Sequence, residues 1–142
     1  MLNRTYDAQN CSIARALEIV GDRWTLLVIR DMMFAGKRHF REFLQSEEGI
    51  SSNVLADRLA MLVERGLVTR AGDPAHAQKA IYSLTELGIS LLPVIASLSQ
   101  WTQVHFPATR RPEARMFLDG DAAAIDALQQ ALRREHLKGG ER

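Results

Sequence analysis

Hydrogen-bonding side chains gather where one predicted helix begins, at Ser51, Ser52 and Asn53. Three leucines follow at helical spacing: Leu55, Leu59 and Leu62. They must face a core, so the opposite face at the helix start stays small and polar. Such a helix end can enter the major groove of DNA and bond to base edges or phosphates. Ser51 is also the expected N-cap, which leaves Ser52 and Asn53 as the stronger candidate contacts.

Basic side chains near this helix are candidates for phosphate contacts. Arg58 lies beside the leucine stripe, where its reach suits a phosphate; the alternative is an ion pair near Asp57. Lys37 and Arg38 form a basic turn before this region, where they either touch the DNA backbone or are simply solvated. Further candidates flank the tip of a predicted hairpin: Arg70, His76, Gln78 and Lys79. Their entry into the minor groove rests on fold analogy alone.

A single cysteine, Cys11, stands at the start of the first predicted helix. The dipole of that helix and the charge of Arg15 favour its thiolate, which predicts a redox-sensitive thiol. A small buried side chain without reactivity is the alternative, and both readings stay open. One cysteine allows no intramolecular disulfide, so an oxidised product is an intersubunit bridge, a mixed disulfide or an alkylated thiol.

Other chemistry has little support in the sequence. The histidines are scattered and lack a paired cysteine, so we interpret them as surface or seam residues: His39, His76, His105 and His136. There is no Gly-rich phosphate loop and no clustered Ser, His and Asp pattern. We therefore expect no metal, no cofactor and no enzymatic activity.

Composition sets the outer limits. The 142 residues are 46% hydrophobic and 25% charged, as in one ordinary soluble domain. The net charge of +1 leaves nucleic-acid binding open, because a balanced total can hide a basic stripe. No signal-peptide pattern occurs and no run reaches the ~18 apolar residues that span a bilayer, which predicts a cytoplasmic protein without a membrane partner.

Short helices account for most of the chain. Asn10 or Cys11 caps a first helix that Gly21 ends. Asp22 caps a second helix over residues 24–34. This helix is apolar on nearly all sides, so we expect it at the centre of the fold. Its residues Trp24 and 32–34 pack in the core or, as a weaker alternative, line an effector pocket. A short helix after position 39, a turn and the helix from Ser51 follow in helix-turn-helix order.

The second half of the sequence predicts a β-hairpin followed by a long helix. Extended runs at 67–70 and 79–84 flank a small, polar tip. Thr85 caps a helix that Pro93 should bend, with a seam from Leu87 to His105 suited to a partner helix. The predicted dimer interface joins this seam to the first helix: Ile13, Leu17, Leu91, Val94, Leu98 and Trp101. Residues 1–106 then form the main domain, and 107–142 form a linker and an amphipathic helix at 121–136.

This order of motifs resembles the HxlR-type transcriptional regulators, a branch of the MarR-like winged-helix proteins. The motifs are Cys11 with ARAL at 14–17, GDRWTLL at 21–27, RHF at 38–40 with EFL at 42–44, GIS at 49–51 with Leu55 and RL at 58–59, GLV at 66–68, YSLT at 82–85 with Gly88, and Trp101. The resemblance implies a mainly helical winged helix-turn-helix with a small β-hairpin and a long C-terminal dimerisation helix. It further implies a homodimer that binds double-stranded DNA at an inverted repeat, controlled through Cys11 or a small effector.

Two features depart from the family pattern. Ser12 stands where many relatives have proline, and the segment after Trp101 extends beyond the usual end. We interpret the extra helix as dimer or core packing rather than ligand gating. Two other functions remain: a winged-helix module that binds only protein, without salt-dependent DNA affinity, and a small enzyme whose polar pocket the sequence does not announce.

Overall fold

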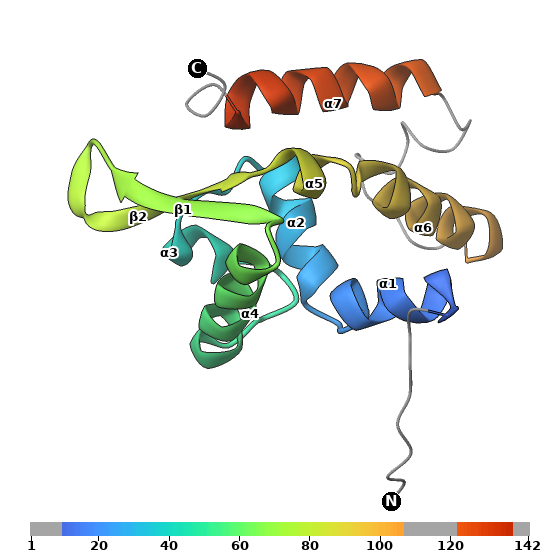
Figure 1. Cartoon of the computed structure of the whole chain (residues 1–142), viewed down its shortest axis with the longest axis horizontal. Helices are drawn as coiled ribbons and strands as arrows, with labels where there is room; N and C mark the ends of the chain where they lie inside the picture. The colour runs from blue at the N-terminus through green and yellow to red at the C-terminus, as the bar shows by residue number, and fades with distance from the viewer. Residues whose placement is uncertain (1–9, 107–121, 138–142) are drawn as a thin grey trace, which may run out of the picture.

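The computed structural model describes residues 10–106 and 122–137. The elements run in the order α1 (Ser12–Val20), α2 (Thr25–Phe34), α3 (Phe40–Phe43), α4 (Ser52–Glu64), β1 (Val68–Asp73), β2 (His76–Leu84), α5 (Glu86–Ile89), α6 (Leu92–His105) and α7 (Ala122–His136). Strands β1 and β2 form an antiparallel hairpin, here called the wing, which extends away from the helices (Figure 1). The predicted mainly helical fold with one hairpin is confirmed.

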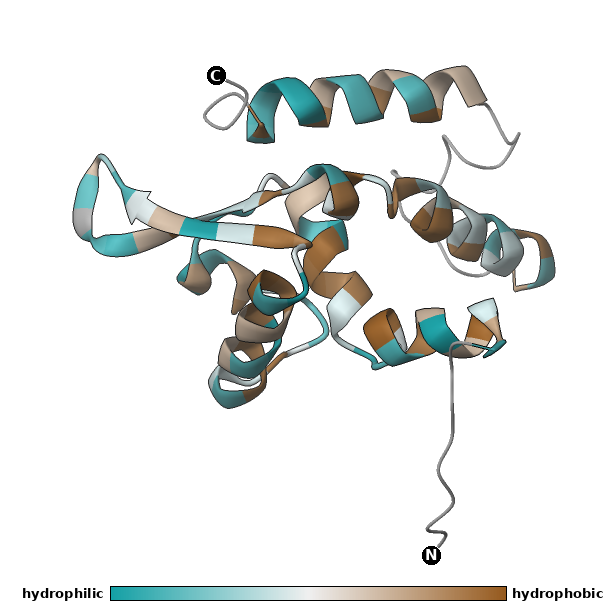
Figure 2. Cartoon of the chain, viewed as in Figure 1, coloured by the Kyte–Doolittle hydropathy of each residue, from teal (hydrophilic) through white to brown (hydrophobic). Residues whose placement is uncertain are grey.

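Helix α2 runs through the centre of the molecule, with α4 on one side and α7 on the other (Figure 1). It buries Val28, Ile29, Met32 and Met33, as its apolar sequence predicts. Figure 2 shows hydrophobic residues along α2 and on the helices around it. The two methionines therefore pack in the core, which agrees with the stronger of the two readings of this cluster. An effector pocket between two copies of the chain stays a prediction. Within the described residues, no helix is both long enough and apolar enough to span a membrane.

Local sequence signals set both ends of α4. The Ser51 hydroxyl accepts a hydrogen bond from the Val54 N–H at 3.2 Å, which confirms the expected N-cap. Gly66 has a φ of 77°, a left-handed conformation that favours glycine. The chain then closes the helix with a bond of 2.9 Å from the Leu67 N–H to the Leu62 carbonyl. All three leucines predicted to face the core are buried: Leu55, Leu59 and Leu62.

The wing is longer than its sequence predicts. Residues 71–78 were expected to form a polar tip, but most of them continue the strands and leave a turn at Pro74 and Ala75. Backbone pairing needs no apolar side chains, so small polar residues can extend a ladder that an apolar pattern does not reveal. The Asp73 carboxylate accepts a hydrogen bond from the Ala75 N–H at 2.9 Å and supports this tight turn.

The expected single helix after Thr85 is divided into α5 and α6, with a break at Ser90 and Leu91. Pro93 is the physical reason. It has no N–H to donate, so it fits the first turn of a new helix better than the interior of a continuous one. The prediction of a bend at Pro93 was therefore wrong, and the wing and α6 are joined by the short helix α5.

Helix α7 packs on the core of the same chain. It contacts β2, α5 and α6, and it buries Leu132 and His136. The packing role predicted for this extra helix is confirmed. The predicted linker and domain boundary at residues 107–112 lie outside the described residues.

Acid should weaken the docking of α7 through His136. Burial, followed by the charge of Arg38, lowers the pKa of His136 from 6.5 to about 4. Because this folded-state pKa lies below that of an exposed histidine, the stabilisation is complete above about pH 6.5 and is lost as the pH falls towards 4. Urea unfolding from pH 7 to 4 should show the wild type losing stability relative to His136→Asn, which has no titrating ring. A constant difference between the two proteins would contradict this expectation.

Candidate nucleic-acid interface

The start of α4 presents small polar side chains to solvent. Ser52, Asn53, Ala56 and Asp57 are all exposed, while Ser51 is used as the cap. Helix α3 precedes α4 and contacts it, so the pair forms the expected helix-turn-helix. The exposed hydroxyl of Ser52 and amide of Asn53 are groups that can bond to base edges or phosphates.

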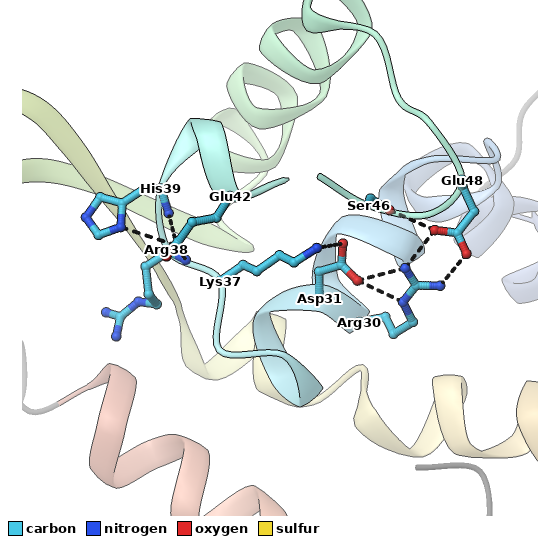
Figure 3. A network of polar contacts seen from close by, with 8 residues as sticks. All are labelled: Arg30, Asp31, Lys37, Arg38, His39, Glu42, Ser46 and Glu48. Carbon is cyan, nitrogen blue, oxygen red and sulfur yellow. Dashed lines mark hydrogen bonds and ion pairs between the residues drawn. The ribbon is translucent and has the colours of Figure 1, made fainter. Parts of the chain in front are cut away.

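An ion-pair network holds the turn before α4 against α2 (Figure 3). Arg30 donates from Nη1 and Nη2 to the two carboxylate oxygens of Glu48, both at 2.9 Å, and also bonds to Asp31. The hydroxyl of Ser46 donates to Glu48 at 2.7 Å. The bidentate contact with Arg30 holds the pKa of Glu48 well below its usual range. The turn that delivers α4 is thereby fixed to the centre of the fold.

Arg58 links α4 to the start of α2. Its Nε lies 2.7 Å from Oδ2 of Asp22, and its Nη1 bonds to the neighbouring Asp57. Asp22 also accepts from the N–H groups of Trp24 and Thr25, as the expected helix cap. Partial burial raises the pKa of Asp22, but the hydrogen bonds from Thr25, Arg58 and Trp24 outweigh it and lower the pKa to about 2. The structure thus contains the ion pair weighed as the alternative for Arg58, and its phosphate contact stays a prediction.

Lys37 and Arg38 turn towards the protein rather than solvent. The Lys37 ammonium lies 3.2 Å from Oδ2 of the buried Asp31. Arg38 Nε donates to the backbone carbonyl of Tyr82 at 2.6 Å, and its Nη2 donates to the hydroxyl of Ser83. Both side chains are half-buried and partnered, so we leave them out of the proposed interface. The basic turn positions β2 instead.

A groove with basic walls lies between α3 and the wing. It has a volume of about 350 Å³ and is lined by His39, Phe40, Arg41, Arg70, Gln78, Lys79, Ala80 and Tyr82. The cations Arg41, Arg70 and Lys79 are exposed, and the described residues that line the groove include no carboxylate. A second hollow beside it shares Phe40, Arg70 and Tyr82 and reaches the face of α4. The two hollows together therefore connect the wing to α4, the helix that carries the predicted base contacts.

His39 fixes the wing to the helix-turn-helix. Its Nε2 lies 2.8 Å from the Asp73 carboxylate in the wing, and its Nδ1 lies 3.3 Å from Glu42 in α3. Bonds from the Ala75 N–H and from His39 lower the pKa of Asp73. The interpretation of His39 as a surface residue was thus incomplete, because it is half-buried and joins two elements.

The structure brings together part of the predicted site. Arg70, Gln78 and Lys79 line the groove, and His76 is exposed near the tip of the wing. Sequence reasoning missed Arg41. A signal was present, because placing the apolar residues of α3 towards the core leaves the residue after Phe40 facing outward.

A large apolar surface is exposed on α1 and α6, at the end of the molecule away from the wing (Figure 1). Ile13 and Leu17 on α1 are 70% and 61% exposed, and α1 buries none of its residues. On α6, Leu98 and Trp101 are 52% and 59% exposed, and Val94 is also exposed. Of the predicted dimer residues, only Leu91 is half-buried and packed against the core of its own chain.

Cys11 caps α1 and is exposed in the single chain. Its Sγ accepts from the N–H of Ala14 at 3.4 Å. Arg15, expected to support the thiolate, pairs instead with Glu18 at 3.5 Å. A redox-sensitive thiol at this position stays a prediction. Among residues 10–106 and 122–137, no three His, Cys, Asp or Glu side chains group as candidate metal ligands.

Comparison with known proteins places this arrangement among transcription regulators. A family model described as HxlR-like helix-turn-helix matches residues 19–110, so α7 lies outside the match. An uncharacterized HTH-type transcriptional regulator of Mycobacterium tuberculosis, Rv3095, is 40% identical over 105 residues. That match covers 74% of this chain and 65% of the relative, so the chain spans less than two thirds of the relative's length.

Solved structures agree with the sequence match. The reduced form of the transcriptional regulator YodB from Bacillus subtilis superposes with a TM-score of 0.57 at 29% identity, covering 70% of this chain and 98% of that one. The redox regulator HypR in its oxidized form superposes with a TM-score of 0.59 at 27% identity, covering 71% and 99% respectively.

Proposed function

This chain belongs to the HxlR-like helix-turn-helix family, and we propose that it regulates transcription as a homodimer on an inverted-repeat DNA site. One observation carries the proposal: α4, whose exposed start is polar, lines a hollow that shares Phe40, Arg70 and Tyr82 with the groove with basic walls. Ser52 and Asn53 would contact base edges, while Arg41, Arg70 and Lys79 would bind phosphates. The ion pairs of Arg30 and Arg58 hold α4 ready for this contact.

The homodimer follows from the apolar surface of α1 and α6. Several large apolar side chains of these helices are exposed, whereas soluble monomers seldom leave such side chains in one patch. A twofold partner would cover both helices at once, because an isologous interface uses the same patch on each copy. Two copies of α4 would then reach half-sites about one helical turn of DNA apart, ~10 bp, or a multiple of that.

Selection of duplexes from a random library, followed by footprinting, tests this proposal. The expected result is an inverted repeat whose enrichment falls steeply as salt increases. Asn53→Ala should blur discrimination at one position of each half-site, at a cost of roughly 1–3 kcal/mol if that contact is bidentate. A protein that dimerises but enriches no sequence would instead support the winged-helix protein-interaction module.

We also propose that Cys11 is the point of effector control. Its thiol is exposed in the single chain, and the similar structures include the redox regulator HypR. Oxidation would join two Cys11 thiols across the dimer or add a small thiol, and either product alters the start of α1 in the proposed interface. Diamide should weaken DNA binding by the wild type and leave Cys11→Ser unaffected. Unchanged affinity, together with a thiol left unmodified by the oxidant, would place the effector site elsewhere.

A further inference from the structure

The outer edge of strand β2 is held by two groups from outside the wing. On this edge the Tyr82 N–H donates to the backbone carbonyl of Arg38 at 2.8 Å, and the Leu84 N–H donates to Nδ1 of His136 at 3.0 Å. Residues 82 and 84 are two positions apart, so their N–H groups point to the same side of the strand. Arg38 thus ties β2 to the helix-turn-helix, and His136 ties it to α7.

Helix α7 also bridges the break between α5 and α6. Pro93 cannot donate to the Ile89 carbonyl four residues earlier, and the Gln129 side chain of α7 donates to that carbonyl at 3.4 Å. Arg133 Nε lies 2.8 Å from Oε1 of Glu86 in α5. One helix therefore contacts the base of the wing, the short helix α5 and the start of α6 (Figure 1).

His136 is held in a costly position for a polar ring. It is 7% exposed, and its Nε2 has no hydrogen-bond partner within the residues that the structure describes. An apolar ring would fill the same space without a buried, unpaired polar group. What the histidine adds is the acceptor Nδ1, without which the buried Leu84 N–H would lose its partner.

We propose that His136 is a positioning residue for the wing: by accepting from Leu84, it fixes the base of the wing to the helix that spans the α5–α6 break. The angle between the wing and the apolar surface of α6 is then set by α7. In a dimer this angle determines how far apart the two basic grooves lie. The inference rests on the proposed function, because the spacing matters only if two copies bind one DNA site.

Two full-length variants test this role. His136→Phe keeps an aromatic ring but removes the acceptor, whereas His136→Asn places an amide oxygen close to the position of Nδ1. Both are measured on duplexes whose half-site spacing is changed in steps of one base pair. The wild type and His136→Asn should show one sharp optimum. His136→Phe should lose about tenfold in affinity at that optimum and tolerate altered spacing, as expected for a loose wing.

Exchange of the Leu84 amide hydrogen supplies a readout that does not depend on DNA. It should be slow in the wild type and in His136→Asn and fast in His136→Phe. Equal protection in all three proteins, or a fast amide in His136→Phe with an unchanged spacing profile, would overturn the proposal. If His136→Phe fails to fold, Arg133→Ala, a change at a half-buried residue of the same helix that removes the ion pair with Glu86, should shift both readouts less but in the same direction. A wild type with no spacing preference would contradict the proposed dimer on DNA, while the amide still reports on His136.

Discussion

Leu98→Asp is expected to give a monomer that binds an inverted-repeat DNA site at least about 100-fold more weakly than the wild type. Leu98 lies on the exposed apolar surface of α6, where Trp101 is one turn away. In the proposed dimer a carboxylate there would be buried without a partner, which costs far more than the lost apolar contact. A monomer then offers one half-site's contacts where the dimer offers two.

Sedimentation at micromolar concentration and anisotropy with labelled duplex measure the two effects. Gln130→Asp, at an exposed position on α7, is the matched control. It should leave the oligomeric state and the DNA affinity unchanged. A wild-type protein that sediments as a monomer would end the argument for a dimer, as would a dimeric Leu98→Asp variant.

The double substitution Arg41→Ala, Lys79→Ala is expected to weaken binding to specific and non-specific duplexes alike. Both side chains are exposed in the basic groove, where they would neutralise phosphates without reading bases. A dimer would lose four such contacts, so the slope of log affinity against log salt should become shallower by about 4. Titrations at several salt concentrations give this slope directly.

Arg134→Ala provides the control for the loss of positive charge. Arg134 is exposed on α7, which lies on the opposite side of the molecule from α4 (Figure 1). This variant should keep the wild-type slope. An unchanged slope in the double variant would remove the groove from the interface, and a loss confined to one sequence would indicate base contacts instead.

The elements of the fold that depend on near neighbours could be predicted from the sequence. The cap at Ser51 and the left-handed turn at Gly66 mark both ends of α4, because capping bonds join residues three to five positions apart. The uniformly apolar segment of α2 predicted its central place. The break between α5 and α6 could also have been predicted from the sequence, because Pro93 favours the first turn of a new helix.

The extent of the wing was harder to predict. Its outer residues are small and polar. They belong to strands because their backbone groups form hydrogen bonds with the backbone of the facing strand. Apolar alternation reports only the half of a strand that faces a core. Residues 71–78 therefore resemble a loop in composition although six of the eight belong to the two strands.

Which basic side chains face solvent was decided by tertiary structure alone. Lys37, Arg38 and Arg58 find partners on other elements and turn inward. Arg41 forms no ion pair within the residues that the structure describes, and it lines the groove. Arg38 and its acceptor at Tyr82 are 44 residues apart, and Leu84 and His136 are 52 apart. Charge and residue type are local properties that the sequence displays. Whether a charge is free for DNA depends on which distant carboxylate or carbonyl the fold brings within hydrogen-bond reach, and only packing determines that.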